Sequence, residues 1–245
     1  MRVYVVRKQG LLLAGMLTAV LLLCGLAAQW FRLVPGNAAP VPSRLVILDP
    51  GHGGIDPGAI GVNSQEEKEI NLAISLCLRD ILLANGYEVL MTREDDRSVH
   101  DPKYKKTAQI KTSDLKNRLK LIREHPDALV ISIHQNKFQQ ESSQGAQMFY
   151  GRKNPASKQL AESIQQSFQT RLQPDNTREI KESTSAVYII HNAENPIVLV
   201  ECGFLSNYKD CANLCDPEYQ KKAAFTIFAG ITEYQSGGAP EPSPD

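Results

Sequence analysis

The sequence lacks an excess of basic charge. Its 245 residues include 27 Lys and Arg against 27 Asp and Glu, and the only charges before Ser43 are the basic residues Arg2, Arg7, Lys8 and Arg32. The rest of the chain therefore carries 23 basic and 27 acidic residues, a net charge of −4. Because unspecific binding to nucleic acid depends on positive charge, we expect no nucleic-acid partner.

Charge is absent altogether between Leu11 and Phe31, a span of 21 residues that is long enough to cross a bilayer as a helix. Basic residues precede this span and no acid does, which places the N-terminus in the cytosol. We predict that residues 1–32 form an uncleaved single-pass membrane anchor and that the rest of the chain is extracytoplasmic. A cleavable signal peptide is the alternative. Lipidation at Cys24 is disfavoured, since no small residue directly precedes it.

Prolines gather in two short segments near the ends of the chain. Three prolines in residues 33–43 indicate a linker, and the Pro- and Gly-rich residues 236–245 indicate a disordered tail. Between them, residues 44–235 are long enough for one globular domain. Cysteine pairs at metal-ligand spacing are scarce. Cys211 and Cys215 are four residues apart, and we favour buried thiols over a disulfide or a metal pair there, with the question of a bond left open.

Within the domain, apolar runs alternate with amphipathic stretches. This alternation predicts a single α/β domain with a mixed, mostly parallel sheet of about six strands, covered by helices on both faces. Sites in such sheets form at the strand ends. The predicted strands are 44–49, 87–92, 128–134, 145–150, 186–190 and 197–201, and the predicted helices are 66–84, 112–124, 155–172 and 217–235.

Two of the predicted strands end on a histidine. The stretch LDPGHGG (48–54) places His52 in a glycine-rich turn, and SIHQN (132–136) places His134 at the end of a second apolar strand. A third strand runs into Glu201, and a carboxylate at the end of a buried strand is costly unless it is paired or faces a cleft. Glu67 lies on the apolar stripe of the following helix at its first turn, although an acid there also stabilises the helix dipole, as Glu66 or Glu69 would.

These four residues suit a catalytic zinc site. Such a site commonly has three imidazole and carboxylate ligands, here His52, Glu67 and His134, with Glu201 as an unligated general base. The compact HExxH motif of many zinc hydrolases is absent. The remaining histidines, His100, His125 and His191, we interpret as incidental. The polar segment 94–112 either rims a cleft or is a solvated loop without a role, and we favour the second reading.

The ordered motifs LDPGHGG, Glu67-Lys68, SIHQN and VECGFLSN (200–207) resemble those of the zinc-dependent N-acetylmuramoyl-L-alanine amidases of the Amidase_3 family. The resemblance covers about residues 44–234. The N-terminal span, the polar segment and the stretch DLKNR (114–118) make the sequence most similar to the CwlD subgroup, the germination-specific amidases of spore-forming bacteria.

The resemblance implies that His52, Glu67 and His134 bind Zn²⁺ and that Glu201 is catalytic, and it selects Glu67 over Glu66 because the family's liganding acid precedes a lysine. It implies hydrolysis of the amide between the lactyl group of N-acetylmuramic acid and L-alanine in peptidoglycan, for muramic δ-lactam synthesis in the spore cortex. The enzyme would then act between the forespore and mother-cell membranes. A zinc peptidase acting within the stem peptide and a non-catalytic wall-binding module are the alternatives, and the need for an activating protein stays open. Cys202, beside Glu201, suggests sensitivity to oxidation.

Overall fold

The computed structural model describes residues 20, 22 and 44–237. Residues 44–237 belong to one compact unit. Apart from Val20 and Leu22, the predicted anchor (1–32) and linker (33–43) lie outside the described residues, as does most of the predicted tail (236–245). Among the residues that are described, no helix is both long and apolar enough to cross a membrane.

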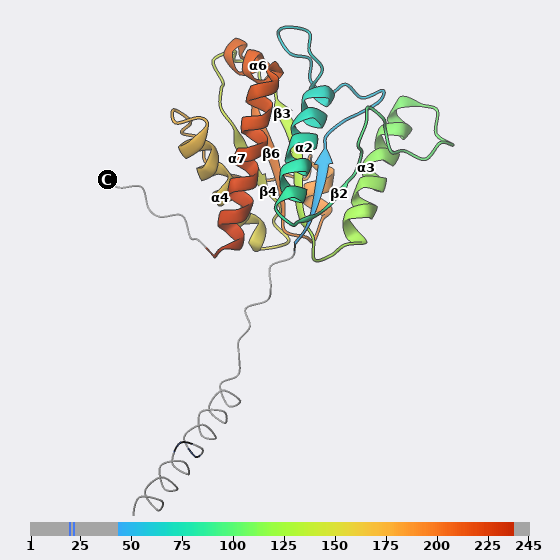
Figure 1. The fold of residues 1–245 in the computed structure, drawn as a ribbon. Coiled ribbons are helices and arrows are strands. Elements are labelled where there is room, and N and C mark those ends of the chain that lie inside the picture. The colour runs from blue at the N-terminus through green and yellow to red at the C-terminus, as the bar shows by residue number, and fades with distance from the viewer. Residues whose placement is uncertain (1–19, 21, 23–43, 238–245) are drawn as a thin grey trace, which may run out of the picture. The chain divides into compact units, whose positions relative to one another are not determined.

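A six-stranded mixed sheet forms the centre of the domain (Figure 1). Its strands lie in the order β2-β1-β3-β6-β4-β5, and only the pairing of β4 with β6 is antiparallel. This confirms the predicted mixed, mostly parallel sheet. The strands are β1 (Leu45–Pro50), β2 (Glu88–Met91), β3 (Leu129–Asn136), β4 (Gln147–Tyr150), β5 (Lys181–Glu182) and β6 (Ile197–Phe204).

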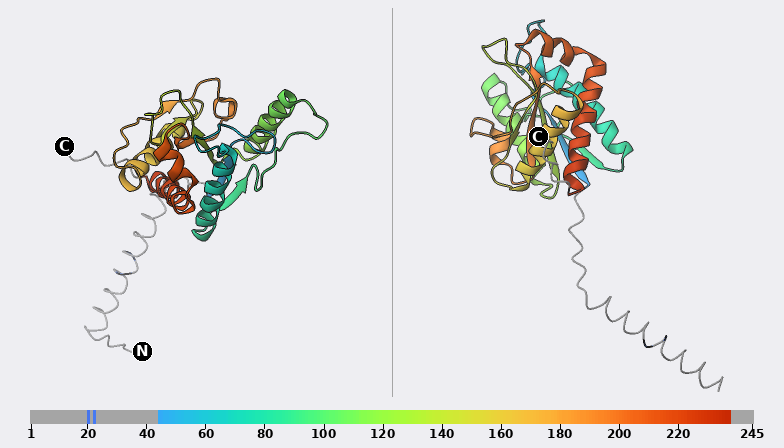
Figure 2. Two further views of the ribbon diagram at one scale, coloured as in Figure 1. Left: turned by 90° about the horizontal axis from the view of Figure 1, so that it is seen from above. Right: turned by 90° about the vertical axis from the view of Figure 1, so that its left-hand side faces the viewer.

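Helices cover both faces of the sheet, as predicted. On one face, α7 packs against both α2 and α4 (Figure 2). The three helices contribute to the larger apolar cluster, which includes Val46 and Leu48 of β1. On the other face, α3 and α5 pack against a smaller cluster that includes Ile47. Because both faces are buried, the strands read as continuous apolar runs. The helices are α2 (Glu67–Ala84), α3 (Thr107–Arg123), α4 (Ala156–Arg171), α5 (Tyr188–Asn192), α6 (Tyr208–Cys215) and α7 (Pro217–Gln235).

One predicted element was wrong, and one predicted helix begins earlier in the chain than expected. Residues 186–190 were predicted as a strand, but the short helix α5 lies there and the fifth strand is at Lys181–Glu182. The apolar run had the composition of a strand, yet Ile189 and Ile190 are buried beside α3 as helical residues, so tertiary packing overrode local preference. Helix α3 begins at Thr107 rather than at 112.

Helix α6 was not among the predicted helices. It begins after Asn207, whose side chain accepts a hydrogen bond from the Asp210 amide. Both of its cysteines are free thiols. The Cys211 thiol donates to the Asn63 carbonyl oxygen, and the Asn63 amide donates to the Cys215 sulfur. The preference for thiols over a disulfide is therefore confirmed.

A buried arginine holds the turn that follows β1. The Arg118 side chain is 1% exposed and forms ion pairs with Asp49 (2.8 Å) and Asp114 (2.6 Å). It also donates to the carbonyl oxygens of Pro50 (2.7 Å) and His52 (2.6 Å). Burial alone would raise the pKa of Asp49, but Arg118 and two hydroxyl donors keep this pKa below its ordinary value. The β1 turn is thus tied to α3 by charge-assisted hydrogen bonds.

We predict that Arg118→Met lowers the free energy of unfolding by about 3–5 kcal/mol, because it leaves the Asp49 carboxylate buried without its cation. Urea denaturation of the full chain measures this loss. The control is Lys116→Met on the exposed side of the same helix, which should change stability little. Equal stability of the two variants would show that the buried pair contributes nothing net.

Candidate metal centre

The four residues singled out in the sequence lie at the carboxyl-terminal edge of the parallel strands. His52 follows β1, His134 lies on β3, Glu201 lies on β6, and Glu67 is the first residue of α2. His134 and Glu201 are register partners on adjacent strands, so their side chains lie next to each other on one face of the sheet. By alternation this is the face that α3 and α5 cover.

Three of these side chains present potential metal-ligand atoms to a common point. Glu67 Oε2 lies 3.2 Å from His52 Nε2, and Glu67 Oε1 lies 2.9 Å from His134 Nδ1. One nitrogen from each imidazole and one carboxylate oxygen all lie within 4.8 Å of one another. Two imidazoles and a carboxylate at this separation are a suitable donor set for a divalent metal ion.

The Glu67 carboxylate is almost fully buried and is fixed by hydrogen bonds from three elements. It accepts from the backbone amides of Ala59 (2.8 Å) and Gln135 (3.1 Å) and from the Asn71 side chain (3.2 Å). Burial alone would raise the pKa of Glu67, but the hydrogen bonds and charges of the two histidines hold it well below its ordinary value. Asn71 was missed in the sequence, although a buried polar residue four positions after Glu67 was a usable signal.

The neighbouring acids of α2 face other partners. Glu66 pairs with Lys68 at 3.2 Å, and Glu69 accepts a hydrogen bond from the Gln65 side chain. Both acids are more exposed than Glu67. The acid that faces the two imidazoles is therefore Glu67.

A glycine allows the close approach of β1 and β3 at this edge. A Cβ atom on Gly51 would lie 2.1 Å from Cε1 of the His134 ring, a separation that atoms cannot adopt. His52 itself has a φ of 62°, in the left-handed region that few residues adopt. The glycines around His52 in the sequence thus reflect both close packing and a turn that a chain of bulkier residues would not form.

The imidazole of His52 is oriented by a side chain that the sequence analysis did not identify. Its Nδ1 lies 3.0 Å from Asp56 Oδ2, and Asp56 Oδ1 accepts a hydrogen bond from Lys111 at 2.8 Å. This leaves Nε2 facing Glu67. Burial lowers the pKa of His52, but the hydrogen bonds to Asp56 and Glu67 outweigh it and raise this pKa to about 9. A carboxylate on the far nitrogen is the usual partner of a metal-binding histidine.

The polar segment 94–112 has partners at the site, so the favoured reading of it as a loop without a role was wrong. Lys111 at its end reaches Asp56, and Asp96 accepts hydrogen bonds from the Gly54 amide (2.8 Å) and from Lys68 (2.7 Å). The segment therefore borders the turn that carries His52.

Glu201 is the one member of the set with a buried oxygen that receives no hydrogen bond from the described part of the chain. Its Oε2 atom has no hydrogen-bond partner there. Burial, with the nearby charge of Glu67, raises the pKa of Glu201 to about 8. A buried oxygen without a partner is costly, so this atom is suited to a partner from outside the described residues.

Cys202 points away from the site, into the larger apolar cluster. Its side chain is fully buried, and burial raises the pKa of its thiol to about 12. A thiol that stays protonated and inaccessible does not react readily with peroxide, so the expected sensitivity to oxidation finds no support.

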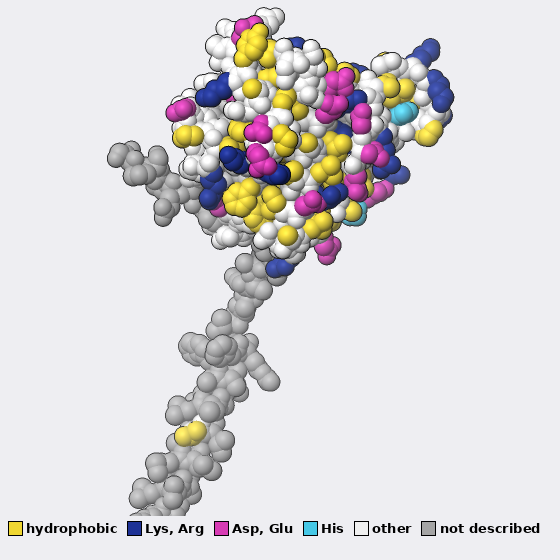
Figure 3. All heavy atoms as spheres, turned by 45° about the horizontal axis from the view of Figure 1, so that its top comes forward, with side chains coloured by type: hydrophobic (Ala, Val, Ile, Leu, Met, Phe, Trp, Pro, Cys, Tyr) yellow, Lys and Arg dark blue, Asp and Glu magenta, His cyan; other side chains and the backbone are white. Residues whose placement is uncertain are grey.

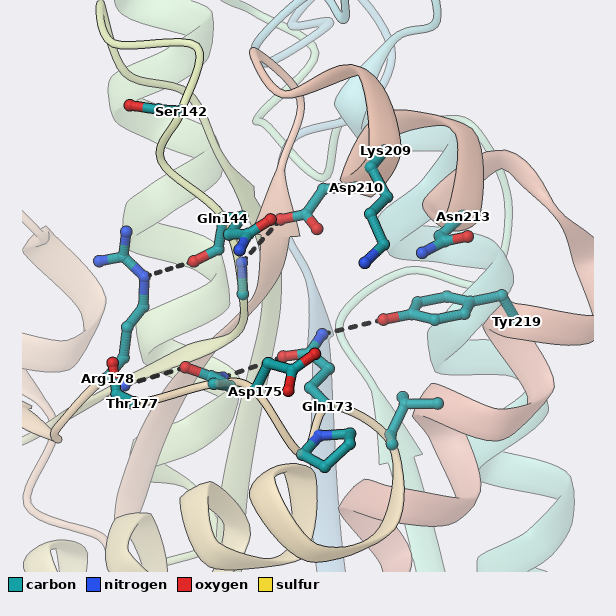
Figure 4. Close-up of a pocket in the computed structure, with 14 residues that line it drawn as sticks. Ser142, Gln144, Gln173, Asp175, Thr177, Arg178, Lys209, Asp210, Asn213 and Tyr219 are labelled. Carbon is teal, nitrogen blue, oxygen red and sulfur yellow. Dashed lines mark hydrogen bonds between the residues drawn. The ribbon is translucent and has the colours of Figure 1, made fainter.

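Two cavities lie at this end of the domain. One, of about 180 Å³, is bordered by His52 and His134 and by residues of α3 and α5. The other, of about 360 Å³, lies between the segment after α4 and the helices α6 and α7, and none of the four site residues lines it (Figure 4).

Charged side chains of both signs are intermixed with apolar ones on the face that Figure 3 shows.

Comparisons with known proteins agree with this geometry. A family model described as N-acetylmuramoyl-L-alanine amidase, Amidase_3, matches residues 46–233. The germination-specific N-acetylmuramoyl-L-alanine amidase of Bacillus subtilis is 36% identical over 204 residues, which are 82% of this chain and 85% of that protein.

Solved structures show the same fold. The CwlD amidase of Clostridioides difficile, solved in complex with the GerS lipoprotein, has 42% identity and a TM-score of 0.76, over 79% of this chain and 98% of that one. The catalytic domain of CwlV, an amidase from Bacillus (Paenibacillus) polymyxa, has 32% identity and a TM-score of 0.64, over 78% and 98%. The chain belongs to the Amidase_3 family of N-acetylmuramoyl-L-alanine amidases, whose substrate is peptidoglycan.

Proposed function

We propose that this amidase is zinc-dependent and that it hydrolyses the amide between the lactyl group of N-acetylmuramic acid and L-alanine. The observation that carries the proposal is the convergence of His52, Glu67 and His134 within 4.8 Å, with Glu201 on the adjacent strand. The family match supports the choice of this amide as the bond that the enzyme cleaves.

The donor set fits zinc. Two imidazole nitrogens and one carboxylate oxygen are three protein ligands of the kind that catalytic zinc sites use, and they leave a position for substrate or water. The Asp56 carboxylate behind His52 supplies the supporting hydrogen bond that such ligands require. When bound, zinc supplies a Lewis acid for a carbonyl oxygen and lowers the pKa of water.

In this reaction Glu201 moves the proton. As a carboxylate it accepts a proton from the attacking water, whose oxygen forms the new bond to the lactyl carbonyl carbon. As a carboxylic acid it then gives the proton to the L-alanine nitrogen when the C–N bond breaks. The products are a free lactyl carboxyl group and a peptide with a free amine. The Oε2 atom of Glu201, without a partner among the described residues, is the oxygen available for this exchange.

The biological setting is also a proposal. The germination-specific relative and the CwlD likeness support a role in muramic δ-lactam synthesis in the spore cortex. We place the catalytic domain outside the cytoplasm, between the forespore and mother-cell membranes, with residues 1–32 as its membrane anchor. The GerS lipoprotein in the CwlD structure supports a protein partner for this chain as well.

The two alternative functions predict different products. Incubation of the full chain with peptidoglycan, with and without a chelator, followed by mass spectrometry of the products, separates them. The proposed amidase releases intact stem peptides, and the chelator stops the release until zinc is added back. A peptidase would release shorter peptides and leave the lactyl amide whole, and a wall-binding module would release nothing.

We predict that Glu201→Gln lowers turnover by about 10²–10⁴-fold but leaves zinc bound, because it removes proton transfer and no ligand. His134→Ala should remove both zinc and activity. Metal analysis and the peptide-release assay on each full-length variant test this, with the exposed Glu182→Gln as the control. Loss of zinc from Glu201→Gln would contradict the assigned roles.

We further predict that Asp56→Asn weakens zinc binding by about 10–100-fold, since the amide holds the His52 ring less firmly and makes it a weaker ligand. Competition with a chromophoric chelator measures the affinity directly. The matched control is Asp80→Asn, which removes an acid with 68% side-chain exposure from α2. An unchanged affinity in Asp56→Asn would exclude Asp56 as a positioning residue.

A further inference from the structure

The structure places different chemistry on the two sides of the candidate metal centre. The strand order β1-β3-β6-β4 puts the His52 and His134 positions between α3 on one side and Glu201 on the other. The 180 Å³ cavity lies on the α3 side, and Glu201 is not among its lining residues. Beyond Glu201 comes β4, whose Gln147 is the register partner of Glu201.

The cavity is mainly apolar. Apart from the two histidines, the residues that hold the β1 turn, Ser98 and the ion pair of Asp56 with Lys111, its walls are four branched aliphatic side chains: Ile55, Ile110, Leu115 and Ile189. Ile110 and Ile189 are 8% and 6% exposed, whereas Leu115 is 38% exposed and lies at the opening. At about 180 Å³ the cavity is smaller than the sites that enclose a whole drug-sized ligand, so it suits one fragment of a substrate.

The opposite side presents a cation. Arg178 Nη1 donates to the Gln147 side-chain oxygen at 3.2 Å. Figure 4 shows its other hydrogen bond, from Nε to the Gln144 carbonyl oxygen at 2.7 Å. Its guanidinium lies 4.4 Å from the centre of the Phe204 ring. A cation held next to the register partner of Glu201 attracts carboxylates to that side.

The chemistry of the proposed reaction determines which half of the substrate lies on each side. The group that protonates the leaving nitrogen must lie within hydrogen-bonding reach of it, so the amine half of the scissile amide faces Glu201. The acyl half then extends the other way, across the two histidines toward the cavity. Within the substrate the muramoyl half is uncharged and carries methyl groups on its lactyl and acetamido substituents, whereas the stem peptide carries free carboxylates.

Taking the proposed amidase function as given, we propose that the apolar cavity between α3 and α5 binds the muramoyl half of the substrate and that the stem peptide leaves over β6 and β4 toward Arg178. Leu115, at the cavity opening, is then a specificity-determining residue for the sugar side. Arg178 has the same role for the peptide side.

Product inhibition tests this orientation. N-acetylmuramic acid and the dipeptide L-alanyl-D-isoglutamine each represent one half of the substrate, and each inhibition constant is measured on the full chain in detergent. Leu115→Trp, which fills the cavity, should weaken inhibition by N-acetylmuramic acid about tenfold and leave the dipeptide unchanged. Arg178→Gln should do the reverse. Leu83→Trp, at an exposed position of α2, should affect neither inhibitor.

Leu115→Gln, a polar variant of similar size, controls for disruption of the fold by the large indole of Leu115→Trp. It should also weaken inhibition by N-acetylmuramic acid. Zinc content of each variant confirms that the metal centre is intact. The proposal is overturned if Leu115 variants weaken the dipeptide alone, weaken both inhibitors equally, or weaken neither. Failure of the wild-type chain to release intact stem peptides would instead overturn the proposed function, and the two failures are therefore distinguishable.

Discussion

The site depends on one buried carboxylate. Glu67 lies at the start of α2 with almost no solvent access, and burying its charge would be prohibitive without partners. Its partners come from the turn after β1, from β3 and from α2 itself, so the pairing that makes the burial tolerable also joins these three elements. The same contacts bring the two imidazoles together. The charge that stabilises the edge of the sheet is therefore the charge available to a metal ion.

Beneath this carboxylate, the fold uses buried arginines to make a turn of unusual shape rigid. Arg118 and Arg93 together donate to the carbonyl oxygens of Pro50, Gly51 and His52. A buried carbonyl oxygen that lacks a donor costs free energy comparable to a lost hydrogen bond, so these donors stabilise the turn. Within this turn His52 has a left-handed backbone conformation. The hydrogen bonds from Arg93 to the Gly51 oxygen and from Arg118 to the His52 oxygen stabilise it. Rigid support of this kind is what keeps ligand geometry within narrow limits.

The sequence was sufficient for the parts of this arrangement that follow from local pattern. Apolar runs identified five of the six strands, because strands buried on both faces need such runs, and the strand ends located His52, His134 and Glu201. Patterns fail where partners are distant: Asp56 and Lys111 are 55 positions apart, and Arg118 reaches back 69 positions to Asp49. Helix α5 was not predicted for the same reason, since its residues are helical through packing against α3 rather than through their own composition.

The uneven covering of the sheet is the physical basis of the proposed substrate orientation. On the face that carries His134 and Glu201, α3 and α5 build an apolar wall beside β1 and β3. Toward β4 and β5, the register partner of Glu201 is the polar Gln147, which accepts a hydrogen bond from Arg178. A substrate with one uncharged half and one acidic half is favoured in only one direction across such a surface, because reversal would bury carboxylates against aliphatic side chains. In the proposed orientation, the order of the strands, more than any single residue, thus sets which side of Glu201 receives the leaving amine.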